Sequence, residues 1–114
     1  MLSKLPACDG WVVFGRYGSG EIAMVIRAAA ALDYGSEVIC KPTVSVVPYG
    51  ASDPGAYGCW LKTWSENEGL LEQLEAAGVL TRTSAVFLIN GVTAQHCELT
   101  EAARAELDRQ ESGQ

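Results

Sequence analysis

The stretch from Lys62 to Gly78 constrains the fold most, because it carries the signals of one amphipathic helix from start to stop. Ser65 followed by Glu68 has the spacing of a capping box, in which each side chain bonds a free backbone amide of the first turn. Glycine at the end of the stretch is typical of a helix stop. The pattern therefore predicts a helix over about 65–77. Its apolar face comprises Leu70, Leu71, Leu74 and Ala77.

The negative charge of the chain lies in its C-terminal half. The formal net charge is −6, and residues 65–111 carry nine acidic against three basic residues, whereas the first 64 residues carry five of each. Such a surface repels nucleic acid and attracts basic protein surfaces. A charged face that only aids solubility is the other interpretation, and the sequence leaves both open.

Length and composition indicate one globular domain over residues 1–114. No run approaches the ~20 apolar residues of a membrane span. Met1–Gly10 lacks the apolar core of a secretion signal, so we expect a cytoplasmic protein with its four cysteines reduced. Residues 1–10 and 110–114 are expected to be loose.

The first half of the chain predicts strands. Trp11–Tyr17 is rich in β-branched and aromatic residues and precedes the turn Gly18–Gly20. Residues 21–34 are ambiguous between strand and helix, because Glu21–Arg27 alternates like a strand while the following alanines favour helix. A helix there would give the opening of a nucleotide-binding fold, but the glycine spacing of such a loop is missing. We favour a hairpin, with the alanine run as a turn or short helical piece.

Two further strands and a loop precede the predicted helix. Glu37–Val47 alternates like a strand, and Pro42 within it requires a sheet edge or a bulge, since proline cannot donate to a ladder. Pro48–Gly58 is expected to be a surface loop, and Tyr57–Thr63 a short strand.

The pair Asn90-Gly91 predicts a closing hairpin over 84–98, because both residues accept the positive φ of a two-residue turn. Ile89 should pair with Val92, and the same register gives the pairs Phe87–Ala94, Ala85–His96, Leu88–Thr93, Val86–Gln95 and Ser84–Cys97. Thr100 should cap a last helix over 101–109, with Ala102, Ala105 and Leu99 facing inward. The expected fold class is α+β, with a mostly antiparallel sheet.

Candidate chemistry is sparse. His96 beside Cys97 suggests a thiol enzyme or redox protein, but adjacent residues of a strand point to opposite faces, so these side chains should not meet. One histidine and four scattered cysteines do not have the spacing of a metal site. We expect no catalytic residue, metal or cofactor. Trp60 and Trp64 are expected to be core or sheet-face residues rather than a ligand platform.

The run Lys62–Gly69, which reads Lys-Thr-Trp-Ser-Glu-Asn-Glu-Gly, resembles the signature of a domain-of-unknown-function family. Those are small bacterial proteins encoded on plasmids, prophages and other mobile elements. Arg16–Ala23, Pro42–Val46 and Gly91–Leu99 resemble the first hairpin, the next strand and the closing strand of that family. The alanine run and the loop before Tyr57 depart from its pattern. The resemblance implies a mobile-element context and no particular chemistry.

The leading hypothesis is a non-enzymatic acidic protein that binds a basic surface on a host protein, as anti-CRISPR and antirestriction inhibitors do. The expected contact residues are Glu66, Glu68, Glu72, Glu75, Lys62 and Trp64. The alternatives are the thiol protein using Cys97 with His96 and a DNA-binding regulator with a winged-helix-like C-terminal half, which the surplus of carboxylates disfavours. No nucleic-acid or membrane partner is expected, and a homodimer is left open.

Overall fold

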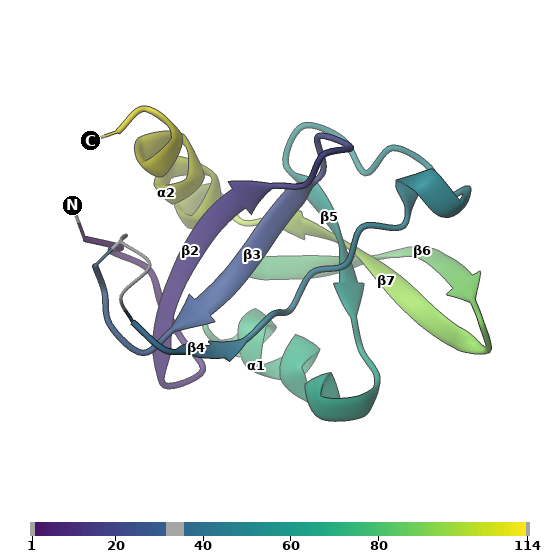
Figure 1. The fold of residues 1–114 in the computed structure, drawn as a ribbon, viewed down its shortest axis with the longest axis horizontal. Helices are drawn as coiled ribbons and strands as arrows, with labels where there is room; N and C mark the ends of the chain where they lie inside the picture. The colour runs from purple at the N-terminus through teal and green to yellow at the C-terminus, as the bar shows by residue number, and fades with distance from the viewer. Residues whose placement is uncertain (1, 32–35, 114) are drawn as a thin grey trace.

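The chain folds as an α+β protein with two antiparallel sheets and two α-helices (Figure 1). The computed structural model describes residues 2–31 and 36–113 of the 114. The strands are β1 (Pro6–Ala7), β2 (Gly10–Arg16), β3 (Ile22–Arg27), β4 (Val38–Cys40), β5 (Gly58–Lys62), β6 (Leu80–Ile89) and β7 (Val92–Leu99). The helices are α1 (Leu70–Ala76) and α2 (Glu101–Glu111), with 3₁₀ turns η1 (Val47–Tyr49) and η2 (Ser65–Asn67).

The first sheet has the order β1-β2-β3-β4 and confirms the predicted hairpin over residues 11–27. Its register pairs Trp11 with Arg27, and the alternating apolar residues of β3 are buried as expected. The alanine run forms bends over residues 28–30 rather than a helical piece, and Ala31 then bridges to Leu2. Residues 32–35 of the ambiguous stretch lie outside the described residues.

The predicted strand over Glu37–Val47 is wrong in length, because β4 ends at Cys40. Pro42 follows, and its carbonyl accepts a hydrogen bond from the amide of Lys62. Thr43 then bridges to Leu61. The chain therefore leaves the first sheet at the proline and runs beside β5, which joins the two sheets. Turn η1 lies at the start of the predicted loop.

The second sheet has the order β5-β7-β6, and its hairpin turn is the one predicted. Asn90 and Gly91 have φ angles of 49° and 80°. The expected pairing holds from Ile89↔Val92 to Val86↔Gln95.

Beyond those pairs the predicted register is wrong, because β6 carries a bulge. Arg82 pairs with Cys97 in place of Ser84, and the residues between Arg82 and Val86 all lie opposite His96. The Gln95 side-chain amide donates to the carbonyls of Thr83 and Ala85 at 2.7 and 3.1 Å. Because the Gln95 side chain satisfies these two carbonyls, the bulge does not leave them as unpaired backbone acceptors.

The stretch predicted as one capped helix over 65–77 forms two elements, the 3₁₀ turn η2 and the helix α1. Ser65 has φ 60° in η2, Gly69 has φ 83°, and α1 begins only at Leu70 with no side-chain cap. The buried Asn67 donates from Nδ2 to the carbonyl of Lys41 at 2.9 Å. This long-range bond holds η2 against the segment after β4. The predicted leucine face is buried, except that Ala77 is exposed.

Helix α2 begins as predicted, since the Thr100 hydroxyl accepts from the amide of Ala103 at 3.2 Å. Of the residues predicted to face inward, Leu99 is buried, but Ala102 and Ala105 are exposed. Ala103 and Leu107, four residues apart, face the core instead, because burying leucine removes more apolar surface from water than burying alanine.

Described residues near both ends of the chain, which were expected to be loose, are held in the fold. Within residues 2–10, Leu5 and Ala7 belong to the core. Gln110 donates to the carbonyl of Val12 and accepts from the amide of Phe14, which fastens the end of α2 to β2.

One core cluster holds the molecule together. It contains residues of both sheets and both α-helices, including Val12, Met24, Leu61, Leu74, Leu80, Leu99 and Leu107. A smaller cluster surrounds Trp60, which is 3% exposed and therefore confirmed as a core residue. Figure 1 shows β2 and β3 crossing over the second sheet, with α1 and α2 at opposite edges of the molecule.

Candidate partner-binding surface

The six predicted contact residues lie in one continuous stretch, from the end of β5 through η2 to α1. Lys62 ends β5, Trp64 precedes η2, and Glu66 lies within that turn. Glu68 follows η2, and α1 carries Glu72 and Glu75. The glutamates are exposed except for Glu75, which is half-buried. The structure thus places the predicted residues along one edge of the fold, although not on one helix.

Lys62 neutralises the first of the glutamates. Its Nζ lies 2.6 Å from Oε1 of Glu66 and 5.9 Å from the ring centroid of Trp64. The hydrogen bond from Lys62, with weaker ones from the backbone amide of Glu66 and the Ser65 hydroxyl, lowers the pKa of Glu66 to about 2. Lysine and glutamate four residues apart thus form a pair, although the segment is not an α-helix.

Arg82 on β6 neutralises two further glutamates, Glu75 and Glu72. Its Nη2 lies 2.6 Å from Oε1 of Glu75 and 3.3 Å from Oε1 of Glu72. The hydrogen bonds from Arg82 lower the pKa of Glu75. The sequence gives no signal for this arginine, because it is separated from α1 by the turn at Gly78 and reaches the helix only through the packing of α1 on β6.

The acidity of this surface is therefore weaker than the sequence predicts. Glu68 is the one member of the four without an ion pair among the described residues. Residues 62–82 keep four carboxylates against two cations. The pairs with Glu66 and Glu72 are largely exposed, and exposed ion pairs contribute little free energy. A cation from outside can consequently compete for these carboxylates.

A groove of about 260 Å³ adjoins these glutamates, and one of its lining residues carries a buried acceptor without a partner among the described residues. Its lining includes Glu68, Glu72, Arg82 and Asn67. Asn67 is 1% exposed, and its Oδ1 has no hydrogen-bond partner among the described residues. An unpaired buried acceptor costs about 1–3 kcal/mol, but this oxygen has less than 1 Å² of accessible surface, so a donor from outside reaches it only if the lining moves. The sequence gives no signal for this residue beyond its place in the Ser-Glu-Asn-Glu run.

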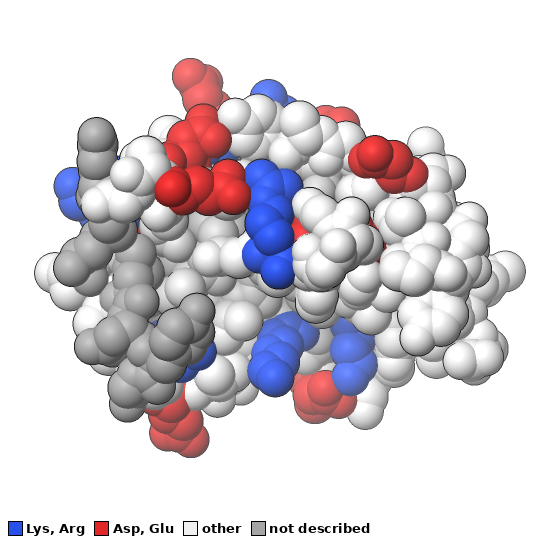
Figure 2. All heavy atoms as spheres, turned by 45° about the horizontal axis from the view of Figure 1, so that its top comes forward, with Lys and Arg blue, Asp and Glu red and all other residues white. Residues whose placement is uncertain are grey.

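The carboxylates of α2 are largely engaged within the fold. The carboxylate of Glu106, 6% exposed, accepts from the Arg109 and Gln110 side chains and the amide of Lys4. Burial raises the pKa of Glu106, but these hydrogen bonds outweigh burial and lower it. Glu111 pairs with Arg16 at 3.0 Å. Figure 2 shows acidic side chains gathered at the end of the molecule that carries α2, with cations between them.

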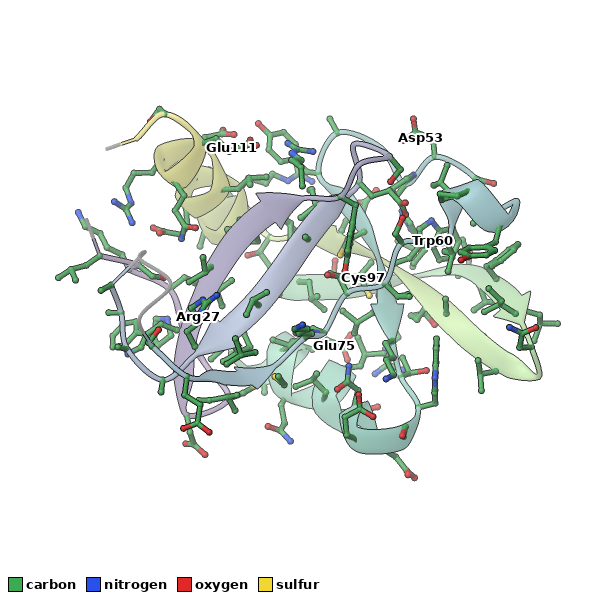
Figure 3. The ribbon with its side chains drawn as sticks, viewed as in Figure 1. Arg27, Asp53, Trp60, Glu75, Cys97 and Glu111 are labelled. Carbon is green, nitrogen blue, oxygen red and sulfur yellow. The ribbon has the colours of Figure 1, made fainter. Side chains whose placement is uncertain are left out.

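The geometry does not support His96 as an activator of Cys97. The His96 ring bonds the Thr83 hydroxyl through Nδ1 at 2.8 Å and the Pro54 carbonyl through Nε2 at 2.9 Å. Cys97 is 0% exposed and lies near the centre of the molecule (Figure 3). Burial, and then the charge of Glu75, raise the pKa of its thiol to about 12. A thiolate at neutral pH is therefore disfavoured.

The turn Gly18–Gly20 is a hairpin turn without the features of a phosphate cradle. Directly after it, the buried Glu21 carboxylate accepts from the hydroxyls of Ser19 and Ser45 at 2.6 and 2.5 Å. A buried carboxylate beside the turn would repel a phosphate.

Within residues 2–31 and 36–113, no group of three or more His, Cys, Asp or Glu side chains is placed to hold a metal ion. In the same part of the chain, no helix is long and apolar enough to cross a membrane.

Comparison of the chain with protein-family models, with curated proteins and with solved structures gives no match in any of the three.

Proposed function

We propose that this chain is a non-enzymatic, cytoplasmic protein that binds a basic surface on another protein through the stretch from Lys62 to Glu75. The observation that carries the proposal is the groove beside α1. Its lining contains the exposed residues Glu68 and Glu72 together with Asn67, whose buried Oδ1 has no partner among the described residues. Carboxylate and amide oxygens accept hydrogen bonds, and lysine and arginine side chains only donate them.

The intramolecular contacts of Arg82 support the same chemistry. Its guanidinium, in the lining of the groove, already bonds the lining residue Glu72 and the neighbouring Glu75, which is the geometry that a basic residue from a partner would use. Trp64 lies half-buried beside Lys62, where an aromatic ring can add apolar contact to a charged interface.

The resemblance of Lys62–Gly69 to a mobile-element family motivates the biological setting. In that setting the partner is a host-defence protein with a nucleic-acid-binding surface, which is basic by necessity. An acidic protein that occupies such a surface would act as an inhibitor of the anti-CRISPR or antirestriction type.

The test is capture of partners from bacterial lysate by the wild-type chain and by a Glu68→Lys/Glu72→Lys variant, with mass spectrometry of the bound proteins. We expect the variant to lose a basic partner, and its association rate with that purified partner to fall, most strongly at low salt.

The matched control is Glu98→Lys/Glu101→Lys, which makes the same change in net charge. Glu101 lies in the first turn of α2 as Glu72 does in that of α1, so both variants place lysine at a helix start. The control should bind the partner with an affinity close to that of the wild type. Equal binding of wild type and the Glu68/Glu72 variant would refute the proposed surface.

A further inference from the structure

The outer edge of β6 is unpaired among the described strands. The second sheet has the order β5-β7-β6, so β7 is paired on both sides and β6 on one. An edge strand presents backbone N–H and C=O groups to any further strand that approaches it. Figure 1 shows this strand and the hairpin turn at one end of the molecule.

The last four residues of β6, Val86–Ile89, form a regular stretch with two apolar faces. Phe87 and Ile89 pack on the cluster around Trp60. Val86 and Leu88, on the opposite face, are 54% and 73% exposed. The bulge before them interrupts the strand, so these four residues form the regular stretch of the edge that adjoins the hairpin turn.

Of the devices that usually block edge pairing, this strand has a bulge before Val86, but the stretch beyond the bulge has no lysine, proline or inward-pointing charge. From Thr83 to Cys97 the sequence has no Lys, Arg, Asp, Glu or Pro. The chain as a whole carries a net charge of −6. In Figure 2 the corresponding end of the molecule shows neither acidic nor basic side chains on the visible face.

We infer that the Val86–Ile89 edge is the interface of a homodimer, in which β6 of one copy pairs antiparallel with β6 of a second. The charge distribution selects this occupant. Two copies of a chain with surplus carboxylates repel each other through most surfaces, and the uncharged hairpin end is where this repulsion is least. A basic partner would gain no Coulomb energy there.

Antiparallel pairing of identical strands is also self-complementary. A two-fold axis brings Val86 and Leu88 of one copy beside Leu88 and Val86 of the other, so that each exposed side chain gains an apolar cross-strand neighbour. The three-stranded second sheets of the two copies then join into one continuous sheet of six strands.

Sedimentation velocity of the full chain, from micromolar to submillimolar concentration, tests the inference. We expect the mass to rise with concentration from 12.1 kDa toward twice that value. The Leu88→Lys and Val86→Lys variants should each raise the dimer dissociation constant by about tenfold or more, because each replaces an apolar cross-strand pair and places two like charges, one from each copy, at the joined edges. Thr81→Lys, exposed on β6 beyond the bulge, adds the same charge and should dimerise nearly as the wild type does.

Salt separates this inference from the proposed function. Screening of like charges should strengthen the dimer as salt rises, whereas binding to a basic partner should weaken. Circular dichroism confirms that each variant is folded. A monomeric wild type throughout the concentration range, or equal weakening by Thr81→Lys and Leu88→Lys, would overturn the dimer and leave the acidic-surface proposal untouched.

Discussion

Two cations determine how strongly the acidic side chains near α1 can attract a partner. Lys62 holds Glu66, and Arg82 holds Glu75 and Glu72. Both cations are partly exposed, so these pairs organise the carboxylates more than they stabilise the fold. A partner that displaces Lys62 or Arg82 exchanges one charge-assisted hydrogen bond for another, which lowers the cost of recognition.

At this scale we predict the titration of Glu66. Its folded pKa of about 2 lies below the unfolded value of ~4.3, so the pair with Lys62 stabilises the fold above the unfolded pKa. That contribution is lost as pH falls from there through the folded pKa. Carboxyl NMR titration of the Lys62→Met variant should show the pKa of Glu66 returning toward its usual range. The Lys41→Met variant is the control, and an unchanged Glu66 value in Lys62→Met would contradict the pairing.

The two α-helices begin by different means, although a hydroxyl-bearing residue suited to capping precedes each of them. Thr100 stands directly before α2, whereas Ser65 stands at the start of η2, ahead of α1. Thr100 caps α2 and also donates to the carbonyl of Gly78 at 2.6 Å. Ser65 caps nothing, because Gly69 turns the chain before α1 begins. What holds the start of α1 is packing of its leucines and the bond from Asn67 to the chain after β4.

This difference predicts unequal costs for two similar substitutions. Thr100→Ala should lower the free energy of unfolding by about 1 kcal/mol, the usual cost of losing a cap. Ser65→Ala should change it by less than about 0.5 kcal/mol, as is common for exposed sites without a structural role. Urea denaturation of both variants measures the comparison. A Ser65→Ala cost equal to that of Thr100→Ala would mean that Ser65 does cap a helix.

On the scale of the whole molecule, the loop between η1 and β5 is fastened to the second sheet. The Trp60 indole donates to the carbonyl of Ser52 at 3.0 Å, and His96 Nε2 lies 2.9 Å from the Pro54 carbonyl oxygen. Gly58 makes the close approach possible, since a Cβ there would lie 1.8 Å from that same oxygen. His96, a candidate for catalysis in the sequence, thus has a structural place in this attachment.

Gly58→Ala should therefore lower the free energy of unfolding by about 3 kcal/mol, because backbone rather than a flexible side chain must move. Gly18→Ala is the matched control: its Cβ would meet nothing within 4 Å. Thermal or urea denaturation of the two variants measures the difference in their free energies of unfolding. If Gly58→Ala proved as stable as Gly18→Ala, the loop would not be held where the structure places it.

The sequence by itself determined the features that depend on near neighbours. The Asn90-Gly91 turn, the Thr100 cap and the alternation of β3 follow from local backbone preferences and side-chain periodicity, and all three are confirmed. These preferences act within a few residues, so distant parts of the chain do not change them.

Tertiary structure alone decided where β4 ends, where α1 begins and which carboxylates are compensated. Each depends on a contact between segments far apart in the chain: Pro42 with Lys62, Asn67 with Lys41, and Arg82 with the glutamates of α1. A hydrogen bond to a distant part of the chain outweighs local propensities of a few tenths of a kcal/mol, and no pattern within one segment reveals the partner of that bond.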